Sequence, residues 1–366
     1  MNKSEIKFFN DYLNINVNSK DEVKKIMHQK YDFNFPLTNL NNKYNFDNDI
    51  SFYYEYQRYD SKLNYKNFEK NFYNLTDVHS KTFFTSCGMS SIYSVLYSLS
   101  KNGKYKFKYA KDIYFETQKL IRAFNFNIGK KIFYFDSISD DFWNQQDVYK
   151  SIIVIDTTCY HPFDVTNMIK ELLKKGNFII LVRSHIKLDM LGLEYCYLGS
   201  ITFLIPDGIT SKKFEKYKSI IKTATDISGN IGTFANQNNI FPLLNNVDFI
   251  NLNRKRIKRI NDNNKYFYDK VKDIFNITLH RHYLFSTISV SNNNFQELLS
   301  FIKKISLDSN GLFNFSSSFG FDYIAVDTYY DLNCSNNTIR VSIGDVTKKI
   351  IDDFIDYFVE KTYDKI

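Results

Sequence analysis

From about residue 85 onward, the chain carries a regular succession of helical patterns and short apolar runs. Apolar side chains recur at helical spacing in the segment Gly88–Leu99, which predicts an amphipathic helix. Four runs rich in β-branched and aromatic residues follow, and each has the length of a strand. These runs are Lys131–Phe135, Ser151–Asp156, Asn177–Val182 and Ser200–Ile205.

A further helical segment lies between the second and third of these runs. PFDVTNMIKELLKKG begins with Pro162 and ends with Gly176, which are residue types typical of a helix start and a helix stop. The order strand, helix, strand favours parallel pairing, and runs without polar alternation indicate strands buried on both faces. We therefore expect an α/β fold with a mostly parallel sheet covered by helices.

After Pro206 the pattern changes to helices and antiparallel strands, which predicts a smaller C-terminal α+β domain. The expected elements are a long helical region at about 234–273, strands near Phe275–Leu279 and Leu284–Val290, and helices at Phe295–Lys304 and about 348–361. The expected domains are an irregular or helical N-terminal segment (1–50), a large α/β domain (51–240) and the small domain (241–366).

Composition excludes several classes of protein. Of 366 residues, 43% are hydrophobic and 17% are aromatic, which rules out a disordered, collagen-like or disulfide-scaffold chain. None of the cysteines has the close spacing of a zinc knuckle or a redox dithiol, so we expect no metal site and a reduced, cytoplasmic setting. The cysteines are Cys87, Cys159, Cys196 and Cys334.

Targeting and charge patterns narrow the partners. The N-terminal residues contain no apolar stretch long enough for a signal peptide, and the longest aliphatic runs, IIVI and FIILV, are strand-sized. Neither secretion nor a membrane partner is therefore expected. The net charge is +8, but the lysines are scattered along the chain, without a basic stripe or a motif that reads nucleic-acid sequence. We therefore expect no nucleic-acid partner.

Candidate chemistry follows the predicted strands, because ligands bind at the carboxyl ends of strands in an open α/β sheet. Asp156 closes the run SIIVID, Ser184 and Lys187 follow FIILV, and a loop around Gly88 opens the first helix. A glycine-containing turn at a helix N-terminus suits a phosphate, a carboxylate can hold a protonated ring nitrogen, and a lysine can form an imine with an aldehyde. These three groups match the three handles of pyridoxal phosphate.

Each group alone also has an ordinary structural explanation. A single Asp after a strand is usually a cap or turn residue, a single Lys is usually solvated, and SCGMSS would also suit a tight turn. Their order along the chain favours the cofactor, because Gly88, Asp156 and Lys187 would lie across neighbouring strand ends.

Three segments carry these groups: SCGMSSI, IDTTCYHP and RSHIKLD. SCGMSSI is similar to the Ser-Gly-Met-Ala-Ala-Ile phosphate loop of the fold-type I pyridoxal-phosphate enzymes, in the cysteine/methionine metabolism group that contains cystathionine synthases and lyases. IDTTCYHP resembles the Asp-Asn-Thr-x-x-x-Pro segment of that group, and RSHIKLD matches its Ser-x-x-Lys. The resemblance covers roughly residues 50–360.

The resemblance implies that pyridoxal 5'-phosphate is the cofactor and that the three segments bind it. Asp156 would lie at the ring nitrogen with Thr158 beside it, and Lys187 would form the internal aldimine and abstract the α-proton of the substrate. The phosphate loop would contribute Cys87, Gly88 and Met89, and Ser184 would join the phosphate shell.

Two more segments resemble cofactor-binding parts of the group. DIYFETQKLI is similar to the segment whose tyrosine stacks on the cofactor ring, so Tyr114 would stack there and relay protons. EYQRYDSKLNYKNFEKNF resembles the Tyr-x-Arg segment, so Tyr56 and Arg58 would reach the cofactor phosphate of the neighbouring subunit. The resemblance therefore implies a homodimer or homotetramer with shared active sites.

Substrate binding is implied nearer the C-terminus. TIRVSIGD resembles an Arg-x-Ser-x-Gly segment, so Arg340 would clamp a substrate carboxylate, for which a planar guanidinium is well suited. SSSFGFD resembles a Ser-Leu-Gly segment, so Ser318 would assist that clamp. The ordinary alternatives are a surface arginine on a strand, a loop serine and, for Tyr114, a core tyrosine.

The sequence also departs from the pattern of the group. Ile186 stands before Lys187 where the group usually has Thr, and no Asn-Pro segment is recognisable upstream of Asp156. His161 and His185 flank the site. His161 has two readings, a local acid or base and a packed or solvated histidine.

We expect a pyridoxal-phosphate-dependent enzyme that acts on an amino acid. Elimination or replacement at the β or γ carbon, as in carbon–sulfur lyases and synthases, is the reaction that the resemblance favours. An aminotransferase would need the same residues. A third hypothesis is a protein of this fold that binds the cofactor or a partner without catalysis.

Overall fold

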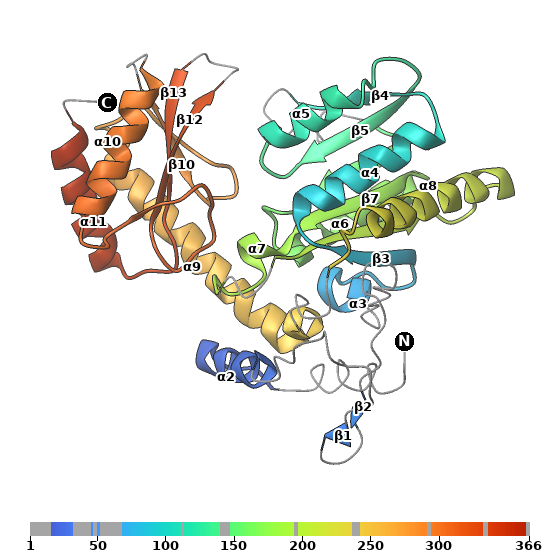
Figure 1. The fold of residues 1–366 in the computed structure, drawn as a ribbon, viewed down its shortest axis with the longest axis horizontal. Coiled ribbons are helices and arrows are strands. Elements are labelled where there is room, and N and C mark those ends of the chain that lie inside the picture. The colour runs from blue at the N-terminus through green and yellow to red at the C-terminus, as the bar shows by residue number, and fades with distance from the viewer. Residues whose placement is uncertain are drawn as a thin grey trace.

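The structure is a computed structural model in which two sheets, each covered by helices, lie side by side (Figure 1). The residues that it describes are 16–31, 45–46, 50–51, 68–110, 113–139, 147–193, 197–235, 242–290, 294–331 and 336–363. We call the first sheet with its helices the α/β half and the second sheet with its helices the C-terminal half. No helix among these residues is both long and apolar enough to cross a membrane.

The α/β half is built on a six-stranded sheet of order β3-β8-β7-β6-β5-β4. Strands β4 to β7 pair in parallel, whereas β8 runs antiparallel to both β7 and β3. The expected mostly parallel α/β sheet is thus confirmed, and the four predicted runs form β5 to β8. The strands are β3 (His79–Thr85), β4 (Tyr105–Lys108), β5 (Lys130–Asp136), β6 (Ile152–Asp156), β7 (Phe178–Ser184) and β8 (Gly199–Ile205).

Helices cover both faces of this sheet, because alternate strand residues point to opposite faces. Ile153 and Ile155 of β6 pack in one core cluster with α3 and α6, whereas Ile152 and Val154 pack in another with α4, α5 and α8. The helices are α3 (Phe68–Tyr73), α4 (Gly88–Asn102), α5 (Phe115–Ala123), the 3-10 turn η2 (Pro162–Val165), α6 (Thr166–Lys174), α7 (His185–Leu188) and α8 (Ser211–Asn230).

The C-terminal half is a five-stranded sheet of order β11-β12-β13-β10-β9 with helices against it. The predicted strands and helices there are confirmed, and the hairpin of β12 with β13 is an addition. The elements are α9 (Val247–Val271), β9 (Ile277–Leu279), β10 (Ser286–Val290), α10 (Phe295–Asp308), β11 (Asn314–Phe315), β12 (Ala325–Asp331), β13 (Asn336–Ser342) and α11 (Lys348–Thr362).

The region between the two sheets differs from the sequence-based expectation. Among the described residues of the expected helical region at about 234–273, the chain forms a short 3-10 turn η4 (Pro242–Asn245) and then α9, which begins at Val247; α8 ends before this region and is an addition. Pro242 lacks the N–H that a continuous helix needs, and the Asn246 side chain accepts a hydrogen bond from Phe249 N, which caps the start of α9. Helix α9 reaches from the α/β half to the C-terminal half (Figure 1).

The remaining described elements precede the α/β half. They are α2 (Lys20–Tyr31) and the two-residue strands β1 (Asn45–Phe46) and β2 (Ile50–Ser51), which pair antiparallel. The Lys20 ammonium forms an ion pair with Asp322, so α2 contacts the C-terminal half.

The first prediction concerns the contribution of the buried strand β7 to stability. Ile180→Ala at its centre removes a fully buried side chain, and we expect it to lower the free energy of unfolding by about 2–5 kcal/mol. Leu307→Ala on α10 is the matched control, because that side chain is 84% exposed and should change stability by about 0.5 kcal/mol or less. Urea denaturation of both variants measures the difference, and equal losses would contradict the assigned core.

Candidate active site

The carboxyl ends of β6 and β7 lie side by side and carry the central residues. The parallel register pairs Asp156 with Val182, and Thr157 N donates to Val182 O at 2.9 Å just beyond the strands. Ser184 N donates to the Thr158 hydroxyl at 3.0 Å. Asp156, Thr158 and Ser184 are therefore brought together at one edge of the sheet.

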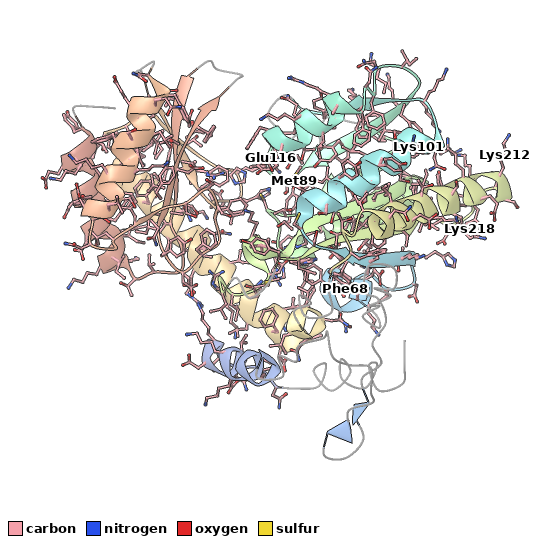
Figure 2. The ribbon with its side chains drawn as sticks, in the orientation of Figure 1. Phe68, Met89, Lys101, Glu116, Lys212 and Lys218 are labelled. Atoms are coloured by element: carbon pink, nitrogen blue, oxygen red, sulfur yellow. The ribbon has the colours of Figure 1, made fainter. Side chains whose placement is uncertain are left out.

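The start of α4 packs directly against this edge. A Cβ added to Gly88 would lie 2.8 Å from the Cβ of Ser184, so only glycine permits this approach. Gly199 on β8 is equally confined, because its added Cβ would lie 2.3 Å from the carbonyl oxygen of Cys87. Figure 2 shows Met89, at the start of α4, on the side of the α/β half that faces the C-terminal half.

Polar groups surround the first turn of α4. Cys87 is the N-cap, and its Sγ accepts from Ser90 N at 3.4 Å. The hydroxyls of Ser86 and Ser90 lie 2.9 Å apart, and Ser90 Oγ also lies 3.2 Å from Cys87 Sγ. Backbone N–H groups and the positive end of the helix dipole meet these hydroxyls, which is an arrangement that suits a phosphate.

Lys187 lies on the short helix α7, at the junction of the two halves. Its Nζ donates to the Ser318 hydroxyl at 2.5 Å and lies 5.8 Å from the centre of the Phe319 ring. The loop that carries these partners packs closely, because a Cβ added to Gly320 would lie 2.0 Å from the carbonyl oxygen of Lys187. Ser318 thus contacts the lysine itself, a contact that its resemblance to a clamp residue did not predict.

Asp156 is a buried carboxyl group with an exposed fraction of 8%. Its Oδ1 accepts from Thr158 N at 2.8 Å. Burial raises the pKa of Asp156, whereas the hydrogen bonds from Thr158 and the charge of Arg183 lower it. A buried acid held in this way favours a cationic partner, because such a partner would offset the cost of desolvating the carboxylate.

Tyr114 lies immediately before α5 and near the same edge. Its backbone N–H donates to Asp136 Oδ2 at 2.9 Å, which fixes the segment to the end of β5. Burial raises the pKa of the Tyr114 phenol, the charge of Glu116 and a hydrogen bond with it raise the pKa further, and the charge of Arg340 lowers it. The phenol is therefore protonated at neutral pH and is hydrogen-bonded with Glu116.

Arg340 lies on β13, opposite Asp327 of β12. Its Nη2 donates to Asp327 Oδ2 at 3.1 Å, and its guanidinium lies 5.7 Å from the centre of the Phe285 ring. The arginine is mostly buried and paired, which differs from the alternative of a solvated surface residue. A carboxylate ligand would share this guanidinium with Asp327.

The two histidines that flank the site in sequence have structural contacts. His161 caps η2 by accepting from Phe163 N at 3.3 Å, and burial lowers its pKa to about 4. His185 is fully buried between Asp189 and Ser200. Tyr56 and Arg58 lie outside the described residues, so their predicted reach into a neighbouring subunit stays a prediction.

Sequence reasoning missed several residues that hold the site together. Asn253 of α9 donates to Leu188 O at 2.5 Å, and Arg256 of α9 donates to Gly320 O at 2.7 Å, so one helix supports both sides of Lys187. Arg183 and Asp189 form a buried ion pair beside α7. The detectable signal for that pair is an arginine at the end of an apolar strand with an acid six residues later.

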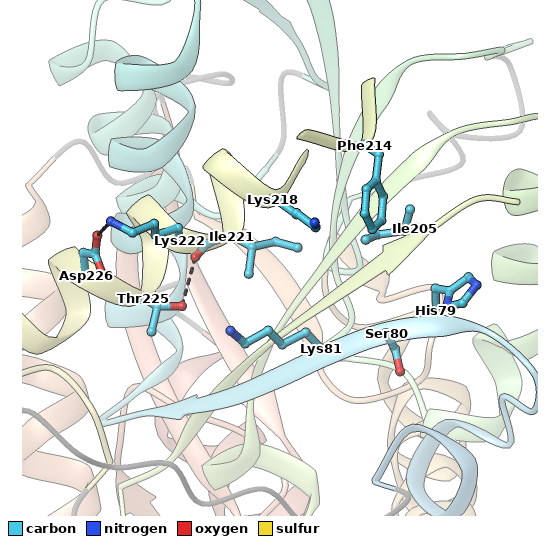
Figure 3. Close-up of a pocket in the computed structure, with 10 residues that line it drawn as sticks. All are labelled: His79, Ser80, Lys81, Ile205, Phe214, Lys218, Ile221, Lys222, Thr225 and Asp226. Atoms are coloured by element: carbon cyan, nitrogen blue, oxygen red, sulfur yellow. Dashed lines mark hydrogen bonds and ion pairs between the residues drawn. The ribbon is translucent and has the colours of Figure 1, made fainter. Parts of the chain in front are cut away.

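A separate hollow lies away from these residues, between α8 and the edge formed by β3 and β8 (Figure 3). Its volume is about 460 Å³, and none of the residues singled out in the sequence lines it. Two of its lysines are already paired, Lys218 with Glu215 at 3.1 Å and Lys222 with Asp226 at 3.0 Å. The hollow therefore shares no lining residue with the site at Lys187.

The cap of α4 generates the second prediction. Cys87→Ala removes the acceptor for Ser90 N, and we expect the free energy of unfolding to fall by about 0.5–2 kcal/mol. Cys87→Ser keeps an acceptor of a preferred capping type, so its stability should equal or exceed that of the wild type. Urea denaturation distinguishes the two, and a serine variant as unstable as the alanine variant would contradict the capping role.

Comparison with known proteins identifies solved structures that share this fold. No family model and no curated protein sequence matches the chain. A solved structure of cystathionine gamma synthase from Xanthomonas oryzae pv. oryzae, in complex with cystathionine, superposes with a TM-score of 0.53 at 12% identity. The match covers 76% of this chain and 81% of that one.

Two further solved structures are similar. One is an O-acetylhomoserine (thiol)-lyase by name, from Campylobacter jejuni, with N'-pyridoxyl-lysine-5'-monophosphate; its TM-score is 0.54 at 14% identity, over 75% of this chain and 81% of that one. The other is a cystathionine gamma lyase from Micromonospora echinospora, with a TM-score of 0.51 at 12% identity, over 76% and 82%. The chain therefore has the fold of the fold-type I pyridoxal-phosphate enzymes, as its motifs implied.

Proposed function

We propose that the protein is a pyridoxal-phosphate-dependent enzyme that acts on an amino acid. The observation that carries this proposal is the placement of three groups along neighbouring strand ends: the start of α4 packs on Ser184 at the end of β7, Asp156 ends the adjacent strand β6, and Lys187 follows β7 on α7. They match the phosphate, the ring nitrogen and the aldehyde of that cofactor. Bound there, pyridoxal phosphate would supply an electron sink for negative charge at the α-carbon of an amino acid.

The chain's own residues fit this group. Gly88 leaves room for a close approach at the α4 turn, where a side chain would collide with Ser184. Asp156 is buried and would be stabilised by a protonated ring nitrogen. Cys87, Met89 and Thr158 belong to the two segments that would hold the phosphate and the ring.

Lys187 Nζ would hold the aldehyde and, once free, would accept the α-proton of the substrate. The Ser318 hydroxyl orients this amine, which keeps it within the site rather than in solvent. Tyr114, as a neutral phenol, would pack on the ring and donate a hydrogen bond near the leaving group. Arg340 would bind the substrate carboxylate, with Asp327 fixing the orientation of its guanidinium.

Within this class, we propose elimination or replacement at the β or γ carbon. The named structures with this fold include a gamma synthase, a thiol-lyase and a gamma lyase, which supports a carbon–sulfur lyase or synthase. We further propose that two or four copies share active sites through Tyr56 and Arg58.

The attachment residue can be tested directly. The protein is incubated with pyridoxal phosphate, reduced with borohydride and mapped by peptide mass spectrometry. We expect a visible absorbance band before reduction and a pyridoxyl adduct on Lys187 after it, because Lys187 directly follows β7, at the sheet edge where Asp156 ends β6. Lys187→Ala should lose both signals.

Lys218→Ala is the matched control, because this exposed lysine lies on α8 in the separate hollow. It should keep the band and the adduct on Lys187. An adduct spread over surface lysines, with no loss in Lys187→Ala, would refute the proposed site.

The reaction type needs a second assay. Amino acids with a thiol leaving group on the β or γ carbon are incubated with the loaded protein and no keto-acid acceptor. A lyase should convert the amino acid and one water into a keto acid, ammonia and the thiol. Turnover that depends strictly on an added keto acid would select an aminotransferase, and turnover that depends on an added thiol would select a replacement enzyme. Cofactor binding without any of these reactions would select the non-catalytic alternative.

A further inference from the structure

A buried arginine lies beside the site without entering it. Arg183 is the last residue but one of β7, and its exposed fraction is 1%. Burying a guanidinium is costly unless its donors are matched by acceptors. Four of its contacts are hydrogen bonds: to both oxygens of Asp189 at 2.6 and 2.7 Å, to Tyr160 O at 2.9 Å, and to Thr157 O.

These acceptors belong to the two segments that carry the proposed chemistry. Thr157 and Tyr160 form the turn that directly follows Asp156, and Tyr160 N closes this turn by donating to Thr157 O at 3.1 Å. Asp189 is the C-cap of α7, two residues beyond Lys187. One guanidinium therefore ties the lysine helix to the turn behind the carboxylate.

Asp189 is itself held from the opposite side. Its Oδ2 lies 2.7 Å from Nδ1 of His185, and Nε2 of His185 lies 2.8 Å from the Ser200 hydroxyl. Burial lowers the pKa of His185, so the ring is neutral, with Nδ1–H donating to Asp189 and Nε2 accepting from Ser200. The network thus extends from β8 through α7 to the turn after β6.

Aromatic side chains seal this network. The Arg183 guanidinium lies 5.4 Å from the centre of the Phe72 ring, and the His185 ring is 5.4 Å from Phe72 and 6.1 Å from Phe84. The side chains of Arg183, His185 and Asp189 are at most 1% exposed. They cannot touch a substrate, so any influence on the reaction acts through Lys187 and Asp156.

We propose that Arg183 is a positioning residue that fixes Lys187 relative to Asp156 by joining α7 to the turn after β6. The proposal rests on the proposed function, because it assumes that Lys187 and Asp156 act on one cofactor. A rigid guanidinium with two parallel hydrogen bonds to Asp189 suits this role, since a displacement of a catalytic group by about 1 Å can cost about 10²-fold in rate. Lysine would keep the charge, but its three donors could not reproduce the four hydrogen bonds of Arg183, which reach both oxygens of Asp189 and two carbonyls.

Arg183 also acts on the carboxylate through its charge. The positive charge lowers the pKa of Asp156 and opposes the rise that burial causes. Without the arginine, Asp156 should take up a proton at higher pH than in the wild type. A change in this titration is an effect that loss of packing alone would not produce.

The test separates positioning from folding with the double variant Arg183→Met, Asp189→Leu. Replacing both members of a buried ion pair by apolar residues often leaves stability unchanged or raised. Removing only one member leaves a buried charge without a partner and is destabilising. Urea denaturation should therefore give a midpoint near that of the wild type. We expect the borohydride-trapped adduct at Lys187 to form about 10²-fold more slowly.

Arg183→Lys is the second variant, which keeps the charge and serves if the double variant does not fold. It should leave the pH dependence of the absorbance band near that of the wild type but slow adduct formation, whereas the double variant should change both. Wild-type rates in every folded variant, with unchanged pH dependence, would overturn the proposal and leave the proposed function intact.

Failure of the proposed function gives a different result, since the wild type itself would then form no adduct at Lys187 and this proposal would fall with it. Amide hydrogen exchange of the cofactor-free protein gives a readout without the cofactor. Faster exchange in residues 157–160 and 185–189 of the double variant is expected. Unchanged exchange there would contradict the joining role of Arg183.

Discussion

The parallel pairing of β6 with β7 is the constraint on which the site depends. Both strands end at the same sheet edge, and their register sets Asp156 beside Val182, five residues before Lys187 in the chain. A slip of one residue would turn Asp156 to the opposite face of the sheet and separate it from the lysine. The apolar side chains on both faces of β6 and β7 pack into different helix layers, so burial holds this register.

The rest of the site is arranged around that edge by close backbone approaches. Gly88 and Gly199 allow the start of α4 to pack against β7 and β8, and Gly320 allows the C-terminal half to pack against Lys187. Charged groups that this packing buries form ion pairs, as Arg183 does with Asp189 and Arg340 with Asp327. The same packing that excludes water also fixes the directions of the reactive side chains, which links the fold to the proposed chemistry.

Much of the α/β half could be predicted from the sequence because its signals are local. The runs SIIVID and FIILV are apolar throughout, and a glycine at the start of a helical pattern marks the turn at Gly88. Helix α8 was missed because lysines and polar residues outnumber its apolar stripe, and β12 was missed because polar residues interrupt it. Contacts such as Lys187 with Ser318, which are 131 residues apart, leave no local signal, and only the resemblance connected those segments to one site.

The central claim is that one cofactor is held by the α4 turn, Asp156 and Lys187 together. A crystal structure of the protein grown with pyridoxal phosphate tests this most directly. The account predicts density continuous with Lys187 Nζ, the phosphate at the first turn of α4 and the ring nitrogen facing Asp156. Density for the cofactor in the hollow beside α8, or attached to another lysine, would contradict it.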